Sequence, residues 1–226
     1  MITVIDEHPD FLITLKPANV DFHDCDGEPG FMSRLSRQFG KPLWPVHRLD
    51  KPTSGLLLVA TSAQACAALS AQFSERQVEK FYLALAHGRP KKKQGLIKGD
   101  MARSRRGSWK LLPTTTNPAI TQFFSYGAGP GRRLYLLKPH TGKTHQLRVA
   151  LKSLSAPIEG DSLYGGEPST RLHLHAFQLG FEWEGQWRRY QQLPTEDFQA
   201  MVERFAPKEW QAPHQLLWPT VGKGTE

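Results

Sequence analysis

The residues best suited to chemistry stand between Val46 and Gly55, in the stretch VHRLDKPTSG. Its carboxylate, Asp50, lies between two cations, Arg48 and Lys51. A proline and a glycine end a turn before an apolar run, LLLVA, so the stretch predicts a loop that feeds a buried strand. A loop held by a rigid strand can direct a carboxylate into a cleft. The plain alternative is a turn aspartate that hydrogen-bonds its own backbone.

Two other side chains of chemical interest lie far along the chain. Residues 79–86 alternate between apolar and other side chains and predict a strand, in which Tyr82 shares a face with Lys80 and is free to point into a cleft. Arg148 falls in the first turn of a predicted helix, where the helix dipole disfavours a cation unless an anion answers it. A half-buried strand tyrosine and a surface arginine are the plain alternatives.

Several separated motifs resemble, in the right order, those of the RluA-type pseudouridine synthases, which isomerise uridine to pseudouridine in structural RNA. The resemblance runs from residue 11 to residue 181 and is carried by Lys-Pro at 16–17, His-Arg-Leu-Asp at 47–50 with Thr-Ser-Gly at 53–55, Lys-x-Tyr at 80–82, HTGKTHQLRV at 140–149, Gly-Asp-x-x-Tyr-Gly at 160–165 and Leu-His-Ala at 174–176. The chain departs from the family pattern at Asn19, where a glycine is usual, and at Asn117-Pro118, where a lysine is frequent.

The resemblance implies an active site formed by Asp50, Tyr82 and Arg148. Asp50 would act at the sugar, Arg148 would stabilise its ionised form in a dry pocket, and Tyr82 would stack on the uracil and assist deprotonation at C5. The reaction breaks the N1–C1′ bond, turns the detached uracil and joins C5 to C1′, so we expect no cofactor. Whether Asp50 attacks C1′ or removes a sugar proton stays open. One placed carboxylate suits an isomerase, whereas most glycosidases use two.

Contacts with RNA are expected from one concentrated basic segment and from residues near the motifs. Between Arg89 and Lys110, nine lysines and arginines face one acid, Asp100, which predicts a phosphate-gripping arm over residues 89–110; a solvated charged face is the alternative. A buried uridine must leave its stack to react, and by resemblance Arg48 would fill the space it vacates. The side chains predicted to contact RNA are Arg48, His47, Lys80, Lys91, Lys92, Lys93, Arg103, Arg105, Arg106 and Lys143.

Two short sequences resemble a nucleotide-binding motif and a metal site, but neither meets the requirements of the motif it resembles. Gly142-Lys143-Thr144 lacks the glycine that a phosphate-binding P-loop needs five residues earlier, since position 137 is leucine. His173 and His175 share a face of a predicted strand, but no third ligand has metal-site spacing, so we expect strand histidines and no metal. Lys16, at the end of another predicted strand, could be a solvated cation or could face RNA.

The elements that must position these groups indicate an α+β fold with a mainly antiparallel central sheet flanked by helices. Strands are expected at 2–5, 11–17, 56–60, 79–86, 117–124, 133–138 and from 171 onward. Helices are expected at 32–39, at 62–77 with Thr61 as N-cap, from a cap at Thr144, and at 194–207. We expect one catalytic domain, residues 1–206, and a C-terminal extension, residues 207–226, without an additional N-terminal RNA-binding domain.

Composition limits the possible partners. The net charge of +8 and the pI near 9.6 fit an anionic partner. The cysteines, Cys25 and Cys66, form no Cys-x-x-Cys pair, which suits a reducing cytoplasm, and no apolar run is long enough to span a membrane. We therefore expect a cytoplasmic monomer that binds ribosomal or transfer RNA. The alternatives are a catalytically inactive RNA-binding or RNA-folding module and a glycosylase that releases uracil.

Overall fold

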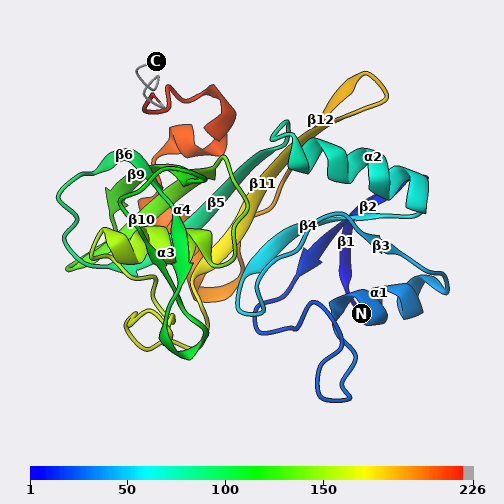
Figure 1. The fold of residues 1–226 in the computed structure, drawn as a ribbon, viewed down its shortest axis with the longest axis horizontal. Coiled ribbons are helices and arrows are strands. Elements are labelled where there is room, and N and C mark those ends of the chain that lie inside the picture. Colours follow the sequence, from blue (N-terminus) through cyan, green and yellow to red (C-terminus); the bar gives the residue numbers. More distant parts are fainter. Residues whose placement is uncertain (221–226) are drawn as a thin grey trace. The chain divides into compact units, whose positions relative to one another are not determined.

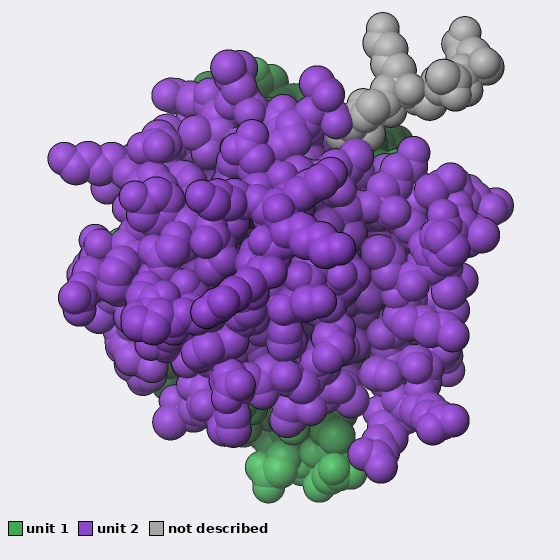
Figure 2. Space-filling model, turned by 90° about the vertical axis from the view of Figure 1, so that its left-hand side faces the viewer, with its two compact units in different colours: residues 1–80, 174–194 green, residues 81–173, 195–226 purple. Residues whose placement is uncertain are grey.

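The computed structural model describes residues 1–220. The chain divides into two compact units, coloured separately in Figure 2: unit 1 comprises residues 1–80 and 174–194, and unit 2 comprises residues 81–173 and 195–226. The chain passes from unit 1 to unit 2 after Lys80, two residues into strand β5. Asp50 therefore belongs to unit 1, whereas Tyr82 and Arg148 belong to unit 2.

Unit 1 is built on a mainly antiparallel arrangement of strands (Figure 1). β1 pairs with β2, β2 with β4, β3 with β4 and β11 with β12, all antiparallel, whereas β4 and β11 pair in parallel. Every residue of β4 is buried, as expected for a strand with neighbours on both edges and a covered surface. The strands of unit 1 are β1 (Thr3–Glu7), β2 (Phe11–Lys16), β3 (Trp44–Pro45), β4 (Ser54–Ala60), β11 (Leu174–Trp183) and β12 (Gln186–Gln191).

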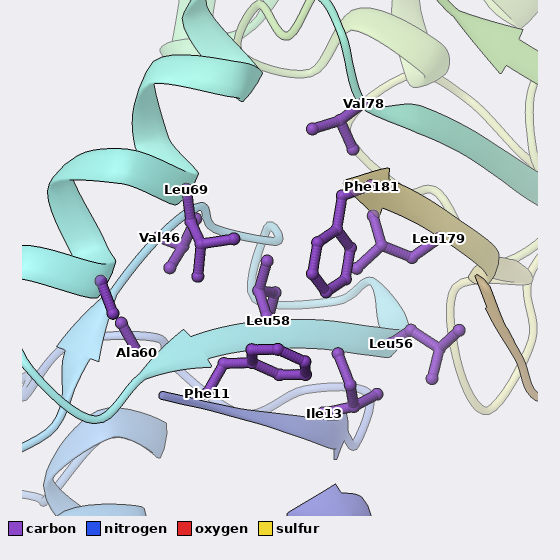
Figure 3. Packing of buried hydrophobic residues seen from close by; sticks show 11 residues of the cluster. Phe11, Ile13, Val46, Leu56, Leu58, Ala60, Leu69, Val78, Leu179 and Phe181 are labelled. Atoms are coloured by element: carbon purple, nitrogen blue, oxygen red, sulfur yellow. The ribbon is translucent and has the colours of Figure 1, made fainter. Parts of the chain in front are cut away.

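An apolar cluster fills the interior of unit 1 (Figure 3). Alternate residues of one strand point to the same face, so β2 and β4 each present a row of side chains to this cluster, and β11 and helix α2 (Ala63–Ser74) close it. The buried members labelled in Figure 3 are Phe11, Ile13, Val46, Leu56, Leu58, Ala60, Leu69, Val78, Leu179 and Phe181. This core holds β4, and with it the loop that carries Asp50.

The helices of unit 1 begin close to the expected positions. Helix α1 (Phe31–Phe39) buries its apolar face and ends at Gly40, which adopts a left-handed conformation. The expected N-cap of α2 at Thr61 is wrong by one residue, because Ser62 accepts the hydrogen bond from the Ala65 N–H at 3.1 Å. The Thr61 hydroxyl instead donates to the Pro9 carbonyl, so it is engaged with another part of the chain.

Unit 2 contains a second set of antiparallel strands, in the order β5-β10-β9-β6 (Figure 1). Within residues 1–220, β7 and β8 pair only with each other and form a separate short hairpin, residues 101–111. The strands are β5 (Glu79–His87), β6 (Gln94–Gly99), β7 (Met101–Arg103), β8 (Trp109–Leu111), β9 (Ala119–Gly127) and β10 (Arg132–Pro139); the helices are α3 (Gln146–Ser153) and α4 (Glu196–Phe205). These elements confirm the expected α+β class with a mainly antiparallel sheet.

The chain beyond α4 packs onto the strands of unit 2. Short 3-10 turns at Lys208–Gln211 and Pro213–Gln215 precede Trp218, whose ring centroid lies 4.8 Å from that of Phe124 and 5.7 Å from that of Phe81. The end of the expected extension, residues 221–226, lies outside the described residues. No helix within residues 1–220 is long and apolar enough to cross a membrane.

Candidate active site and RNA-contact residues

The Asp50 loop ends in a tight turn that leads directly into β4. The Thr53 N–H donates to the Asp50 carbonyl at 3.0 Å, and the Asp50 side chain is half-buried. Gly55 follows with φ +125°, and a Cβ atom there would lie 2.4 Å from the backbone nitrogen of Ala176 on β11. Only glycine fits this close approach of two strands, so Gly55 determines where the loop joins the sheet.

Lys16 anchors the same loop. Its side chain is fully buried, with 0% exposed, and its ammonium group donates to the carbonyls of Pro17, Val20 and Lys51, each at 2.9 Å. Both sequence expectations for Lys16, a solvated cation and a side chain facing RNA, are therefore wrong. Because Lys51 follows Asp50 directly, the buried ammonium fixes the peptide next to the candidate carboxylate.

Phe73 of α2 holds two of the residues predicted to contact RNA. The His47 ring stacks on Phe73 with centroids 4.5 Å apart, and the Leu58 N–H donates to His47 Nε2 at 3.0 Å. Burial, aided by the charge of Lys80, lowers the pKa of His47 to about 3, so this ring is neutral at physiological pH. The Lys80 ammonium lies 5.7 Å from the Phe73 centroid, and burial lowers the Lys80 pKa. His47 thus holds the loop and brings no positive charge to a phosphate.

Arg48 and Lys51, the cations on either side of Asp50, have exposed side chains. Lys51 forms an ion pair with Asp21, with Nζ and Oδ2 2.6 Å apart, and this contact raises the Lys51 pKa. Arg48 stands between the anchored His47 and Leu49, which is buried. The loop therefore presents Arg48 at the surface from a fixed backbone, as a contact with RNA requires.

Tyr82 lies near the start of β5 in unit 2. It stands opposite Leu137 of β10, and its side chain is half-buried. Its neighbours in the strand, Phe81 and Leu83, are buried on the opposite face. Tyr82 therefore lies on the face opposite these apolar residues, as expected, whereas from Leu83 to Ala86 both faces of β5 are buried.

Arg148 forms a buried ion pair with Asp161, a partner that the sequence did not identify. Arg148 Nε and Nη2 donate to the two carboxylate oxygens of Asp161, each at 2.8 Å, and only 6% and 2% of the two residues are exposed. The guanidinium carbon also lies 5.0 Å from the ring centroid of Tyr164. This bidentate contact uses one edge of the planar guanidinium and fixes its orientation.

The start of α3, the helix that carries Arg148, differs from the expected position. Thr144 is not its N-cap; the helix begins at Gln146, and His145 occupies the cap in a left-handed conformation with φ 57°. The Gln146 side chain accepts from the Thr141 hydroxyl at 2.6 Å and from the Lys143 N–H at 3.1 Å. Its amide also donates to Ile120 and Thr121 of β9. Among the residues that the structure describes, no side chain caps the start of α3, and Gln146 instead fastens this end of the helix to the sheet.

The remaining member of this string is Lys143, one of the predicted RNA contacts. Its side chain is half-buried, and Nζ donates to the Asn117 carbonyl at 2.5 Å.

The basic segment is not one continuous arm. Lys91, Lys92 and Lys93 lie exposed in the loop that precedes the edge strand β6, whereas the arginines lie in the β7–β8 hairpin. Asp100 connects the two parts, and its carboxylate accepts the backbone N–H groups of Thr116 and Asn117 at the base of the hairpin. The hairpin residues predicted to contact RNA, all exposed, are Arg103, Arg105 and Arg106.

The strand histidines have protein partners. His175 Nδ1 lies 2.8 Å from the Ser54 hydroxyl and its Nε2 lies 3.0 Å from the Gln192 carbonyl. His173 Nε2 lies 3.4 Å from the carboxylate of Asp197. Within the described part of the chain, no group of three or more His, Cys, Asp or Glu side chains could hold a metal ion.

The predicted site residues are thus distributed over both units. Unit 1 brings His47 and Lys80 together on Phe73, and unit 2 connects Arg148 to the β7–β8 hairpin through Tyr164. Sequence reasoning missed the supporting residues. Asp161 and Tyr164 stand within a recognised motif, but one sequence does not show which distant side chain each of them meets. The supporting residues that only the structure reveals are Lys16, Gln146, Asp161 and Tyr164.

Comparisons with known proteins agree with these motifs. The sequence model of the RNA pseudouridylate synthase family matches residues 10–153. An RNA pseudouridine synthase of Haemophilus influenzae, described as uncharacterized, is 48% identical over 198 residues, which cover 86% of this chain and 88% of the relative. The ribosomal large subunit pseudouridine synthase C of Rickettsia bellii is 39% identical over 140 residues, covering 58% of this chain and 46% of the relative.

A solved structure shows the same fold. The human RNA pseudouridylate synthase domain containing 1 aligns with a TM-score of 0.75 and 27% sequence identity, over 92% of this chain and 89% of the human chain.

Proposed function

Because the chain belongs to the RNA pseudouridylate synthase family, we propose that it isomerises a uridine of ribosomal RNA, with Asp50 as the catalytic carboxylate. The enzyme class is RNA pseudouridine synthase, an isomerase. Ribosomal RNA is preferred to transfer RNA because the name of the Rickettsia relative specifies the large ribosomal subunit.

The main observation in support of Asp50 as the catalytic carboxylate is that its loop is immobilised. The Thr53 turn, the buried ammonium of Lys16 and the close approach at Gly55 each constrain this loop. A reacting carboxylate gains most when its geometry is set before the substrate arrives, because misplacement by an ångström can cost a hundredfold in rate. An ordinary surface turn has no need of a fully buried lysine.

Arg148 and Tyr82 complete the proposed catalytic set. The ion pair with Asp161 occupies the Nε–Nη2 edge of Arg148 and holds the guanidinium in one orientation. Arg148 would stabilise the ionised form of Asp50, and Tyr82 would stack on the uracil.

The exposed basic residues serve RNA binding in this proposal. Arg48 takes the space of the flipped base, while the lysine loop and the arginines of the hairpin bind phosphates around it. Lys80 and Lys143, which are half-buried, contact RNA close to the reacting nucleotide.

The proposed function is tested with RNA from cells that lack the gene for this chain. The purified protein is incubated with ribosomal RNA and, separately, with transfer RNA, and pseudouridines are mapped by carbodiimide modification and primer extension. We expect a new pseudouridine at a defined position of ribosomal RNA, without a change in RNA mass. Release of free uracil would identify a glycosylase, modification of transfer RNA alone would overturn the substrate, and binding without any modification would identify an inactive RNA-binding module.

We also propose that the enzyme acts as a monomer in the cytoplasm. Light scattering of the purified protein should give the mass of one chain, 25.5 kDa. A stable dimer at working concentration would overturn the first part of this proposal.

A further inference from the structure

Tyr164 contacts three functional parts of unit 2. Its side chain is buried, and its hydroxyl accepts the N–H of Trp109, on strand β8, at 2.9 Å. The same hydroxyl lies 2.8 Å from Nδ1 of His145, the N-cap of α3, and the ring lies 5.0 Å from the guanidinium carbon of Arg148. A phenol has one proton and two lone pairs, so one hydroxyl can serve both hydrogen bonds. Tyr164 therefore joins the hairpin to the helix that carries Arg148.

On the hairpin side, the structure is short and stiff. Backbone hydrogen bonds connect Ser104 to Ser108, with the Ser104 N–H 2.8 Å from the Ser108 carbonyl, and close the turn that exposes Arg105 and Arg106. Strand β8 lies in contact with α3, and Trp109 is the residue whose N–H reaches Tyr164. A phosphate held by the two arginines therefore acts on a compact element with a direct hydrogen bond to Tyr164.

On the helix side, the contact supports a strained residue. His145 has φ 57°, a left-handed conformation that is unfavourable for a residue with a side chain. Arg148 follows three residues later, in the first turn of the helix. Loss of the hydroxyl would leave His145 without this partner and allow the first turn to relax, with a corresponding shift of the guanidinium.

We propose that Tyr164 is a positioning residue that couples the binding of RNA by the β7–β8 hairpin to the placement of Arg148. This inference rests on the proposed function, in which Arg148 serves Asp50 and the hairpin binds phosphates. The hydroxyl of Tyr164 transmits the position of the hairpin to His145, and its ring supports one face of the guanidinium. Tyr164 itself exchanges no proton with the substrate.

The first test is Tyr164→Phe, which removes the hydroxyl and keeps the ring beside Arg148. We expect the single-turnover rate at saturating ribosomal RNA to fall about tenfold, the equivalent of one hydrogen bond of about 1.4 kcal/mol, while the dissociation constant for RNA changes by less than about twofold. The matched control is Tyr135→Phe, because Tyr135 is also buried and its hydroxyl has no hydrogen-bond partner among the described residues. The single-turnover rate of this control variant should stay within about twofold of wild type.

A double-mutant cycle separates coupling from a purely structural role. In the wild-type background, the pair Arg105→Ala and Arg106→Ala should slow the single-turnover step several-fold even at saturating RNA. In the Tyr164→Phe background the same pair should weaken RNA binding equally but slow the step no further, because the connection is already broken. If the arginine pair slows the step by the same factor in both backgrounds, the coupling is overturned. A Tyr164→Phe variant whose single-turnover rate is within about twofold of wild type would overturn it as well.

A second variant covers the case in which Tyr164→Phe lowers the melting temperature too far for assay. Trp109→Pro removes the N–H that reaches the hydroxyl, and Ser108, with φ −80° and ψ 170°, already has the extended backbone that a following proline requires. We expect a similar loss of rate, and a wild-type rate in this variant would overturn the inference. Asp50→Asn is assayed in parallel. Activity of that variant would overturn the proposed function itself, independently of the result for Tyr164.

Discussion

At the scale of single residues, the loop of Asp50 depends on groups that have no chemical role of their own. Gly55 permits β4 to approach the backbone of Ala176, and Lys16 gathers three carbonyl groups in a place that solvent does not reach. A buried ammonium is costly unless each of its donors is satisfied, and Lys16 Nζ donates to three carbonyl groups, one for each of its N–H groups. Both residues can be tested by substitution without touching the proposed catalytic groups.

Replacement of Gly55 by alanine should destabilise the protein strongly. The new Cβ would lie 2.4 Å from the Ala176 nitrogen, and the backbone has φ +125°, where a side chain is strained. We expect a loss of roughly 2–4 kcal/mol in unfolding free energy, measured by urea denaturation. Gly185→Ala is the matched control, since Gly185 has φ +74° with open space around it and should cost only about 1 kcal/mol. Equal losses in the two variants would show that the close approach does not matter.

Lys16→Met should reduce both stability and catalysis. The substitution keeps the length of the side chain but leaves the carbonyls of Pro17, Val20 and Lys51 without their charged donor. We expect a loss of roughly 2–4 kcal/mol in unfolding free energy and a lower kcat, because the peptide after Asp50 is released. Lys41→Met, at an exposed lysine, should change the unfolding free energy by less than about 0.5 kcal/mol. A Lys16→Met protein with wild-type stability and turnover would contradict the anchoring role.

At the scale of elements, the basic segment has two parts with different supports. The lysines occupy an exposed loop before β6, while the arginines sit on a hairpin that Asp100 fastens at its base. Hydrogen bonds from Thr114 and from the backbone of Asn117 and Thr116 lower the pKa of Asp100, so the single acid of the segment stays ionised while it holds the hairpin. The loop and the hairpin should therefore contribute separately to RNA binding.

Neutralisation of Lys91, Lys92 and Lys93 by glutamine should weaken RNA binding and flatten its dependence on salt. If each lysine neutralises one phosphate, the slope of log K against log salt should decrease by about 2–3, with little change in the single-turnover rate at saturating RNA. Filter binding over a range of salt concentrations measures this slope. Lys41→Gln serves as the control. An unchanged slope in the triple variant would show that the three lysines form a solvated charged surface and do not bind phosphates.

Sequence reasoning succeeded where a local pattern determines the element. The alternation in β5 and the apolar run of β4 predicted both strands to within a few residues, since side-chain period and burial are local properties. It failed at two predicted N-caps. The Thr61 hydroxyl donates to the Pro9 carbonyl, and Thr144 lies before the start of α3, which begins at Gln146. Hydrogen-bond partners that lie far apart in sequence decide such boundaries.

The same limit applies to the candidate site. The motifs containing Asp50, Tyr82 and Arg148 were recognised from residue type and order, because each is a short local string. The contact between Arg148 and Asp161 was not predicted, since a single sequence carries no distance between two motifs. The burial of Lys16 was missed for the same reason: its partners are carbonyl groups, which every residue has.

At the scale of the whole molecule, the proposed catalytic set is divided between the two units. Asp50 and its anchors belong to unit 1, and Tyr82, Arg148 and the β7–β8 hairpin belong to unit 2. Each unit holds its own residues rigidly, by Lys16 in one and by Asp161 and Tyr164 in the other. The proposed catalysis needs Asp50 as well as Tyr82 and Arg148, so loss of any of these three side chains should reduce turnover far more than RNA binding.

The most direct test of this account is the single-turnover conversion of ribosomal RNA, from cells lacking the gene, by the wild-type and Asp50→Asn proteins. We predict pseudouridine with the wild type and none with Asp50→Asn, while the two dissociation constants for RNA agree within about threefold, because the substitution preserves shape and removes only the charge. An Asp50→Asn protein that forms pseudouridine at a rate within about tenfold of wild type would contradict the assignment of Asp50 as the catalytic carboxylate.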